Sequence, residues 1–124
     1  MILSDNVRNG EIVVGNFPGN LEHLAIIFSS DFPEIMVRKS NSYMLRREED
    51  DKAYLLLISR RDPGPLPFNL MVTVLGSDPS RIKELISSVM ENSPVKLSPA
   101  PSYVKACSEE FYQAISRYLS ASDN

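Results

Sequence analysis

Two apolar runs decide the fold of this chain: Ala53-Tyr54-Leu55-Leu56-Leu57-Ile58 and Phe68-Asn69-Leu70-Met71-Val72-Thr73-Val74. Both runs have the length and composition of β-strands, and both are apolar at odd and even positions alike. Because successive side chains of a strand point to opposite faces of the sheet, such strands need cover on both faces. We therefore expect a central sheet that is shielded from water on each side.

Length and composition are those of a single globular domain. The chain has 124 residues, of which 43% are hydrophobic and 23% charged, so one core is enough to hold it. Its formal net charge of −3 means that the molecule as a whole repels nucleic acid and anionic lipid, unless a local basic patch overrides the average. Eight arginines against five lysines, with nine prolines, are compatible with a thermophilic source.

The cysteine content and the apolar runs limit the cellular context. Cys107 is the single cysteine, so the chain forms no internal disulfide and assembles no multi-cysteine metal cluster by itself. Residues 1–8 lack the apolar stretch of a signal peptide. The longest unbroken apolar run, 53–58, has six residues, whereas a membrane-spanning helix needs about 20. We expect a cytoplasmic protein with no membrane partner.

Strand-like runs alternate with turn signals over the first part of the chain. Gly15 to Gly19 is a predicted turn, Glu48 to Asp51 is the predicted tip of a hairpin, and Asp62-Pro63-Gly64 predicts a type II turn. The strands are expected over residues 11–14, 34–39, 42–48, 52–61 and 68–75.

Two helices are predicted around these strands. Asn20 is a good N-cap, and the apolar residues after it follow helical spacing over residues 20–29. The β-branched Ile26 and Ile27 fall off that stripe and leave a strand as the alternative. Asp78 followed by Pro79 begins the second helix, whose helical periodicity continues to Asn92.

The last part of the chain is a connector followed by an amphipathic helix. Three prolines between residues 93 and 102 predict an extended segment that spans on the order of 30 Å. Residues 103–121 then form a predicted helix, which covers the second face of its own sheet or of a second copy. Its apolar stripe, our candidate interface, consists of Val104, Cys107, Phe111, Ala114, Ile115, Tyr118 and Leu119.

These elements predict an α+β domain. The predicted fold is a single antiparallel sheet of four to five strands with helices packed on it, in the order β-α-β-β-β-β-α-α, and residues 1–92 form its core. The connector 93–102 and the helix 103–121 complete the same domain or a dimer. From Glu11 to Asn92 the element order resembles one repeat of the TATA-binding-protein fold, and profilin-like and longin-like domains share much of it. The resemblance concerns element order alone and carries no residues across.

Catalytic and cofactor signatures are weak. His23 lies off the predicted apolar stripe, and no nucleophile accompanies it in a recognisable motif. Gly15 and Gly19 lack the lysine and the further glycine of a phosphate-binding loop. The acidic tip Glu48–Asp51 lacks the spaced ligand pattern of a calcium loop, which favours a solvated turn. We expect no enzyme, no cofactor and no metal.

The one basic cluster lies between residues 38 and 61, where seven cations against four acids give +3. Arginines on a sheet can grip phosphates, and Tyr43 and Tyr54 could stack on bases, although strand-end cations also protect sheet edges. The candidate nucleic-acid residues are Arg38, Lys39, Arg46, Arg47, Arg60 and Arg61, with Lys52 as the seventh cation.

Three functions follow from these observations. The first is a non-catalytic protein–protein interaction module, a homodimer or small subunit of a larger assembly, that uses the apolar sheet or the surface of the C-terminal helix. The alternative is a nucleic-acid-binding protein that uses the arginines of the 38–61 hairpin. The third is a small-ligand sensor with a cavity between sheet and helices.

Overall fold

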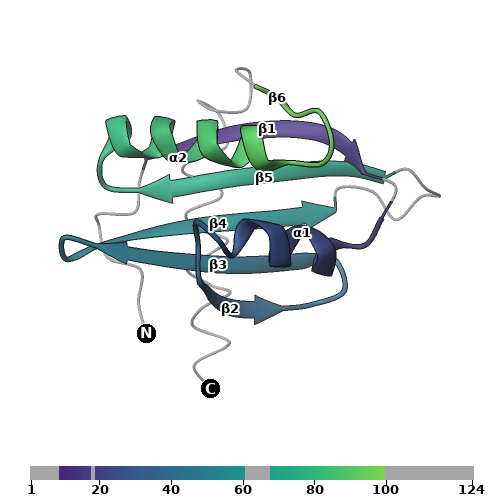
Figure 1. The fold of residues 1–124 in the computed structure, drawn as a ribbon, viewed down its shortest axis with the longest axis horizontal. Coiled ribbons are helices and arrows are strands. Elements are labelled where there is room, and N and C mark those ends of the chain that lie inside the picture. Colours follow the sequence, from purple (N-terminus) through teal and green to yellow (C-terminus); the bar gives the residue numbers. More distant parts are fainter. Residues whose placement is uncertain (1–8, 18, 61–67, 100–124) are drawn as a thin grey trace.

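The structure is a computed structural model that describes residues 9–17, 19–60 and 68–99. These residues form one antiparallel sheet of six strands in the order β2-β3-β4-β5-β1-β6, with two helices packed on it (Figure 1). The predicted α+β class is confirmed. The elements are β1 (Asn9–Phe17), α1 (Leu21–Phe28), β2 (Glu34–Arg38), β3 (Ser42–Glu49), β4 (Lys52–Arg60), β5 (Phe68–Gly76), α2 (Pro79–Asn92) and β6 (Ser98–Pro99).

The two apolar runs are the central strands β4 and β5, which pair with Leu55 opposite Leu75 and Leu57 opposite Thr73. Side chains on both faces of these strands are shielded from water. Leu56 is fully buried on one face and Leu55 is 2% exposed on the other. The prediction of two buried faces is therefore confirmed for this pair of strands.

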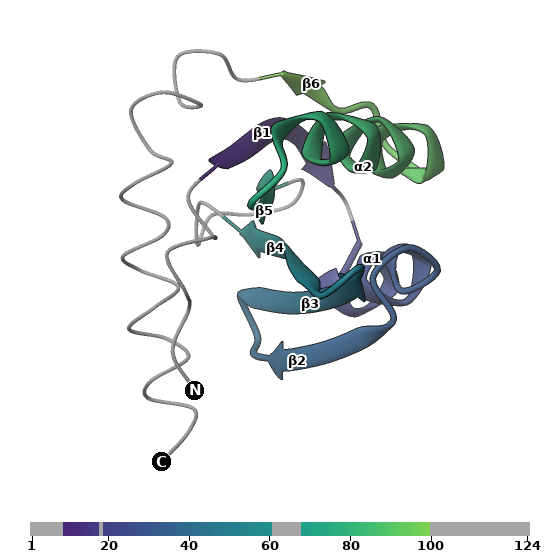
Figure 2. The same ribbon diagram turned by 90° about the vertical axis from the view of Figure 1, so that its left-hand side faces the viewer.

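Both helices lie on the same face of the sheet, which we call the helix face (Figure 2). α1 packs over β3 and β4, and α2 packs over β1 and β5. The core that they form with the strands includes Leu24, Phe28, Leu56, Val72, Ile82 and Val89.

The helix termini follow from their capping residues. Asn20 accepts a hydrogen bond from the backbone N–H of His23 at 3.1 Å, so residues 21–28 form a helix rather than the alternative strand. Asp78 accepts from the backbone N–H of Ser80 at 3.0 Å, and Pro79 occupies the first turn of α2. The predicted bounds of this second helix are confirmed.

The opposite side of the sheet, which we call the second face, is also apolar. One row of side chains crosses it from Met44 through Leu57 and Thr73 to Ile12, following the strand register. Neither described helix lies on this face. The predicted helix over 103–121 lies outside the described residues. Other buried residues of the second face are Val37, Leu55, Met71 and Leu75.

β1 is longer than the predicted strand, and the predicted turn at Gly15 is wrong because Gly15 and Asn16 continue to pair with β5. A Cβ at Gly15 would lie 2.6 Å from the carbonyl oxygen of Lys96. The glycine thus permits the close approach of the segment that leads into β6.

β6 itself was not predicted as a strand, because its two residues fall in the connector 93–102. Ser98 and Pro99 pair with Val14 and Val13 at the sheet edge, where a proline without a donor is tolerated. The structure therefore has one strand more than the sequence predicted.

The β3–β4 hairpin turns at Asp50 and Asp51, which have φ values of 52° and 63°. Glu48 and Glu49 belong to β3, so the predicted four-residue tip is shortened to a two-residue loop. Positive φ at both loop residues is the pattern of a type I′ turn, which matches the twist of the flanking strands. The predicted turn at 62–64 lies outside the described residues.

Candidate functional site

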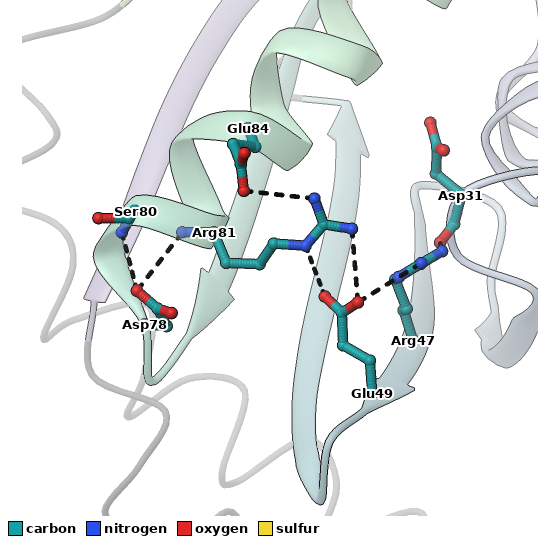
Figure 3. A network of polar contacts seen from close by, with 7 residues as sticks. All are labelled: Asp31, Arg47, Glu49, Asp78, Ser80, Arg81 and Glu84. Carbon is teal, nitrogen blue, oxygen red and sulfur yellow. Dashed lines mark hydrogen bonds and ion pairs between the residues drawn. The ribbon is translucent and has the colours of Figure 1, made fainter.

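A group of charged side chains joins α2 to the end of β3 (Figure 3). Arg81 in the first turns of α2 donates from Nε to Glu49 Oε1 at 2.6 Å and from a terminal nitrogen to Glu49 Oε2 at 3.4 Å. Arg81 also reaches Glu84 at 3.4 Å, one turn further along the same helix. The paired geometry with Glu49 is the strong, two-bond form of an arginine–carboxylate contact.

Arg47 extends this group towards α1. Its guanidinium lies 3.5 Å from Glu49 Oε2 and donates to the backbone carbonyl of Asp31 at 3.0 Å. The Asp31 carboxylate accepts from Ser88 Oγ at 2.7 Å and from the Asn92 amide at 3.3 Å. The loop after α1, the end of β3 and the length of α2 are thus tied together by polar contacts.

The contacts within this group shift the pKa values of Glu49 and Arg81 so that both stay charged. The hydrogen bond from Arg81 lowers the pKa of Glu49, and the same contact raises the pKa of Arg81. Burial, with the nearby acids Asp78 and Glu49, raises the pKa of Tyr54. Glu49 stays ionised and paired at neutral pH, so it is unsuited to move protons and acts as a structural anion.

The candidate nucleic-acid residues are not pooled on one surface. Arg46 is paired with Glu48 and with Glu34, and its pKa is raised chiefly by the hydrogen bond to Glu48. Arg47 follows it in β3 and therefore points to the opposite face, where it meets Glu49. These two arginines are partly neutralised by carboxylates.

Arg38, Lys39 and Arg60 lie at the other end of the hairpin. The backbone N–H of Arg60 donates to the carbonyl of Asn41 at 2.9 Å, which places β4's end beside the turn that carries Arg38 and Lys39. Arg38 and Lys39 are exposed. Arg61 lies outside the described residues. The described basic residues of the 38–61 hairpin are therefore split between its two ends.

The acidic tip does not gather its carboxylates around a common point. Glu48 turns to Arg46 and Glu49 turns to Arg81, while Asp50 and Asp51 form the exposed loop. The predicted solvated tip is found for the exposed Glu48, Asp50 and Asp51, and it is wrong for Glu49, which is half-buried against Arg81. Within the ranges that the structure covers, no cluster of three or more metal-ligating side chains is found.

His23 is exposed on α1 and lies outside the polar group of Figure 3. All seven interface candidates from Val104 to Leu119, Cys107 among them, lie outside the described residues. Neither α1 nor α2 is long and apolar enough to cross a membrane.

α1 carries an exposed apolar pair that was not predicted from the sequence. Ile26 is 58% exposed and Ile27 is 36% exposed, and both lie on the outer side of α1. Their position off the helical stripe had suggested a strand. The same observation, taken together with the N-cap at Asn20, predicts a helix that carries apolar side chains on its solvent side.

Comparison with known proteins gives no relative from which a role could be inferred. The chain matches no protein-family model, no curated protein sequence and no solved structure.

Proposed function

We propose that this chain is a non-catalytic protein–protein interaction module, and that it forms a homodimer through the outer side of α1. The observation that carries the proposal is the exposure of Ile26 and Ile27 in a helix of eight residues, of which six are apolar. Neighbouring apolar side chains exposed on the surface of a helix can mark an interaction site. In α1 only the inner side is covered within the described part of the chain.

The proposed interface on α1 differs from the interface expected from the sequence, which used the apolar sheet or the C-terminal helix. The second face of the sheet is already shielded, with Leu55 and Leu75 at 2% and 0% exposure. A partner would need to displace whatever shields that face. The outer side of α1 is accessible without such a rearrangement.

The sheet edges are poorer docking surfaces than α1. β2 has five residues and a register shift between Ile35 and Val37, and β6 has two residues, one of them proline. Short, irregular or proline-containing edge strands resist pairing with another chain. Association by strand addition is therefore disfavoured at both edges.

A second copy is the occupant that the surface fits best. The outer side of α1 carries no lysine or arginine, and its exposed residues are the apolar pair Ile26 and Ile27 together with Glu22 and His23. An apolar patch of this kind is complementary to itself across a two-fold axis, the commonest symmetry of soluble oligomers. Because eight helical residues span only about 12 Å, the patch is smaller than the roughly 800 Å² per partner of a standard interface, and the dimer should be weak.

The experiment is sedimentation velocity of the full chain over a wide concentration range. We expect a reversible monomer–dimer equilibrium in the wild type and a monomer in the variant Ile26→Asp/Ile27→Asp. The matched control is Lys83→Gln/Ser87→Asp on the exposed side of α2, which changes the net charge by the same −2 and should dimerise like the wild type. A wild-type chain that stays monomeric at every concentration would overturn the proposal.

The alternatives have less support. Two of the candidate residues of the nucleic-acid hypothesis, Arg46 and Arg47, are engaged by acids, which weakens that hypothesis. The ligand-sensor hypothesis requires a cavity between the helices and the sheet, whereas the hydrophobic residues there are packed into one core. Binding of a nucleic acid that weakens steeply with added salt would revive the first alternative.

A further inference from the structure

The second face of the sheet is shielded although neither described helix lies on it. Its central residues Met44, Leu55, Met71 and Leu75 are between 0% and 4% exposed. The strand register places them in adjacent rows, with Leu55 opposite Leu75 and Ser59 opposite Met71. A surface this apolar and this wide requires an apolar cover.

We propose that the cover is the C-terminal stripe of the same chain, from Val104 to Leu119, packed as a helix across the second face. This inference is independent of dimerisation through α1. It assigns the seven residues that the sequence marked as an interface to an intramolecular contact.

The length and position of the chain support this occupant. The described chain ends at β6, where Pro99 pairs with Val13 at the sheet edge, and 25 residues follow it. A helix over 103–121 would be about 28 Å long, and strands of eight or nine residues are about as long. One such helix can therefore run along the middle of the second face.

The covalent link between β6 and the C-terminal stripe favours packing of the stripe on its own sheet over packing on a second copy. β6 adjoins β1, whose Ile12 lies on the second face and is 1% exposed, so the segment leaves the sheet beside the surface that it would cover. A short linker gives an effective concentration of about a millimolar or more, which exceeds the concentration of free protein in most experiments. Packing within one chain should therefore win at ordinary protein concentrations.

Cys107 makes the proposal testable in the full chain, because it is the single cysteine and belongs to the stripe. We expect its reaction with a thiol reagent such as dithionitrobenzoate to be at least about tenfold slower than in the unfolded chain, through protection by packing. The protection should not change on dilution. The matched control is Cys107→Ser/Gln113→Cys, whose thiol lies off the stripe and should react at the rate of an exposed cysteine.

A second variant tests the surface from the other side. Leu57 is half-buried on the second face, and Leu57→Asp should speed the reaction of Cys107 at least about tenfold if the helix rests on that face. The exposed substitution Ser87→Asp on α2 should leave the rate unchanged. A thiol that reacts as fast as the control overturns the proposal, and protection that is lost on dilution assigns the cover to a second copy instead.

Discussion

Arg81 in α2 and Glu49 at the end of β3 are 32 residues apart and are joined by a contact of 2.6 Å from Nε to Oε1. The contact fixes the first turns of α2 to the β3–β4 hairpin, and Arg47, two residues before Glu49 in β3, approaches the same carboxylate. This polar contact holds α2 to the sheet in addition to the apolar packing between them.

Removing the charge of Glu49 should destabilise the fold. We expect Glu49→Gln to lower the free energy of unfolding by about 0.5–1 kcal/mol at pH 7, because a partly exposed pair is worth little more. Since the pKa of Glu49 is lowered in the folded state, its contribution is present above the unfolded pKa of about 4.3 and is lost as the pH falls through the folded value. Urea unfolding at pH 7 and pH 3 measures both effects.

The control for that variant is Glu84→Gln. Glu84 contacts the same arginine at 3.4 Å, but its side chain is far more exposed, so the expected change is close to zero. Equal losses in the two variants, or a loss in Glu49→Gln that persists at pH 3, would contradict the assigned role of Glu49.

A glycine in the β3–β4 loop should stabilise the fold. Asp51 has a φ of 63°, a conformation that glycine adopts without strain, so Asp51→Gly should raise the free energy of unfolding by about 0.5–1 kcal/mol. Asp51→Ala removes the same charge without relieving the strain and should not stabilise. Thermal unfolding of the three proteins separates backbone strain from charge repulsion, and an equal gain in both variants would point to charge instead.

Thr73 is the one buried polar residue in the described core, at 1% exposure, and its hydroxyl has no hydrogen-bond partner among the described residues. Replacing an unsatisfied buried hydroxyl by a methyl group removes its desolvation cost, which is about 1 kcal/mol or more. We expect Thr73→Val to be more stable than the wild type and Thr73→Ser to be less stable. A destabilised valine variant in urea unfolding would show that the hydroxyl is satisfied.

The sequence predicted the elements whose signals are local. Both ends of α2 were predicted correctly. The N-cap Asp78 and the first-turn Pro79 mark its start, and the helical spacing of apolar residues continues to its end. The two apolar runs predicted the central strands and their buried faces. α1 was predicted with a strand as alternative, since Ile26 and Ile27 did not fit the stripe.

The missed features depend on contacts between distant parts of the chain. β1 extends through Gly15 because the ladder with β5 outweighs the local preference for a turn. β6 exists only because the edge of β1 is available to Ser98 and Pro99. The pairing of Glu49 with Arg81 requires the sheet order, which no local pattern contains. The exposure of Ile26 and Ile27 follows from the sequence once residues 21–28 are taken as a helix, because both lie off its apolar stripe.

Burial of both faces of the central strands is tested most directly by comparing Leu55→Ala with Leu56→Ala in urea unfolding of the full chain. These neighbours in β4 point to opposite faces and are 2% and 0% exposed. Each substitution should cost about 2–5 kcal/mol, the usual loss for a buried leucine. A Leu55→Ala variant as stable as the wild type, beside a strongly destabilised Leu56→Ala, would show that the second face is open to water and would contradict a sheet buried on both sides.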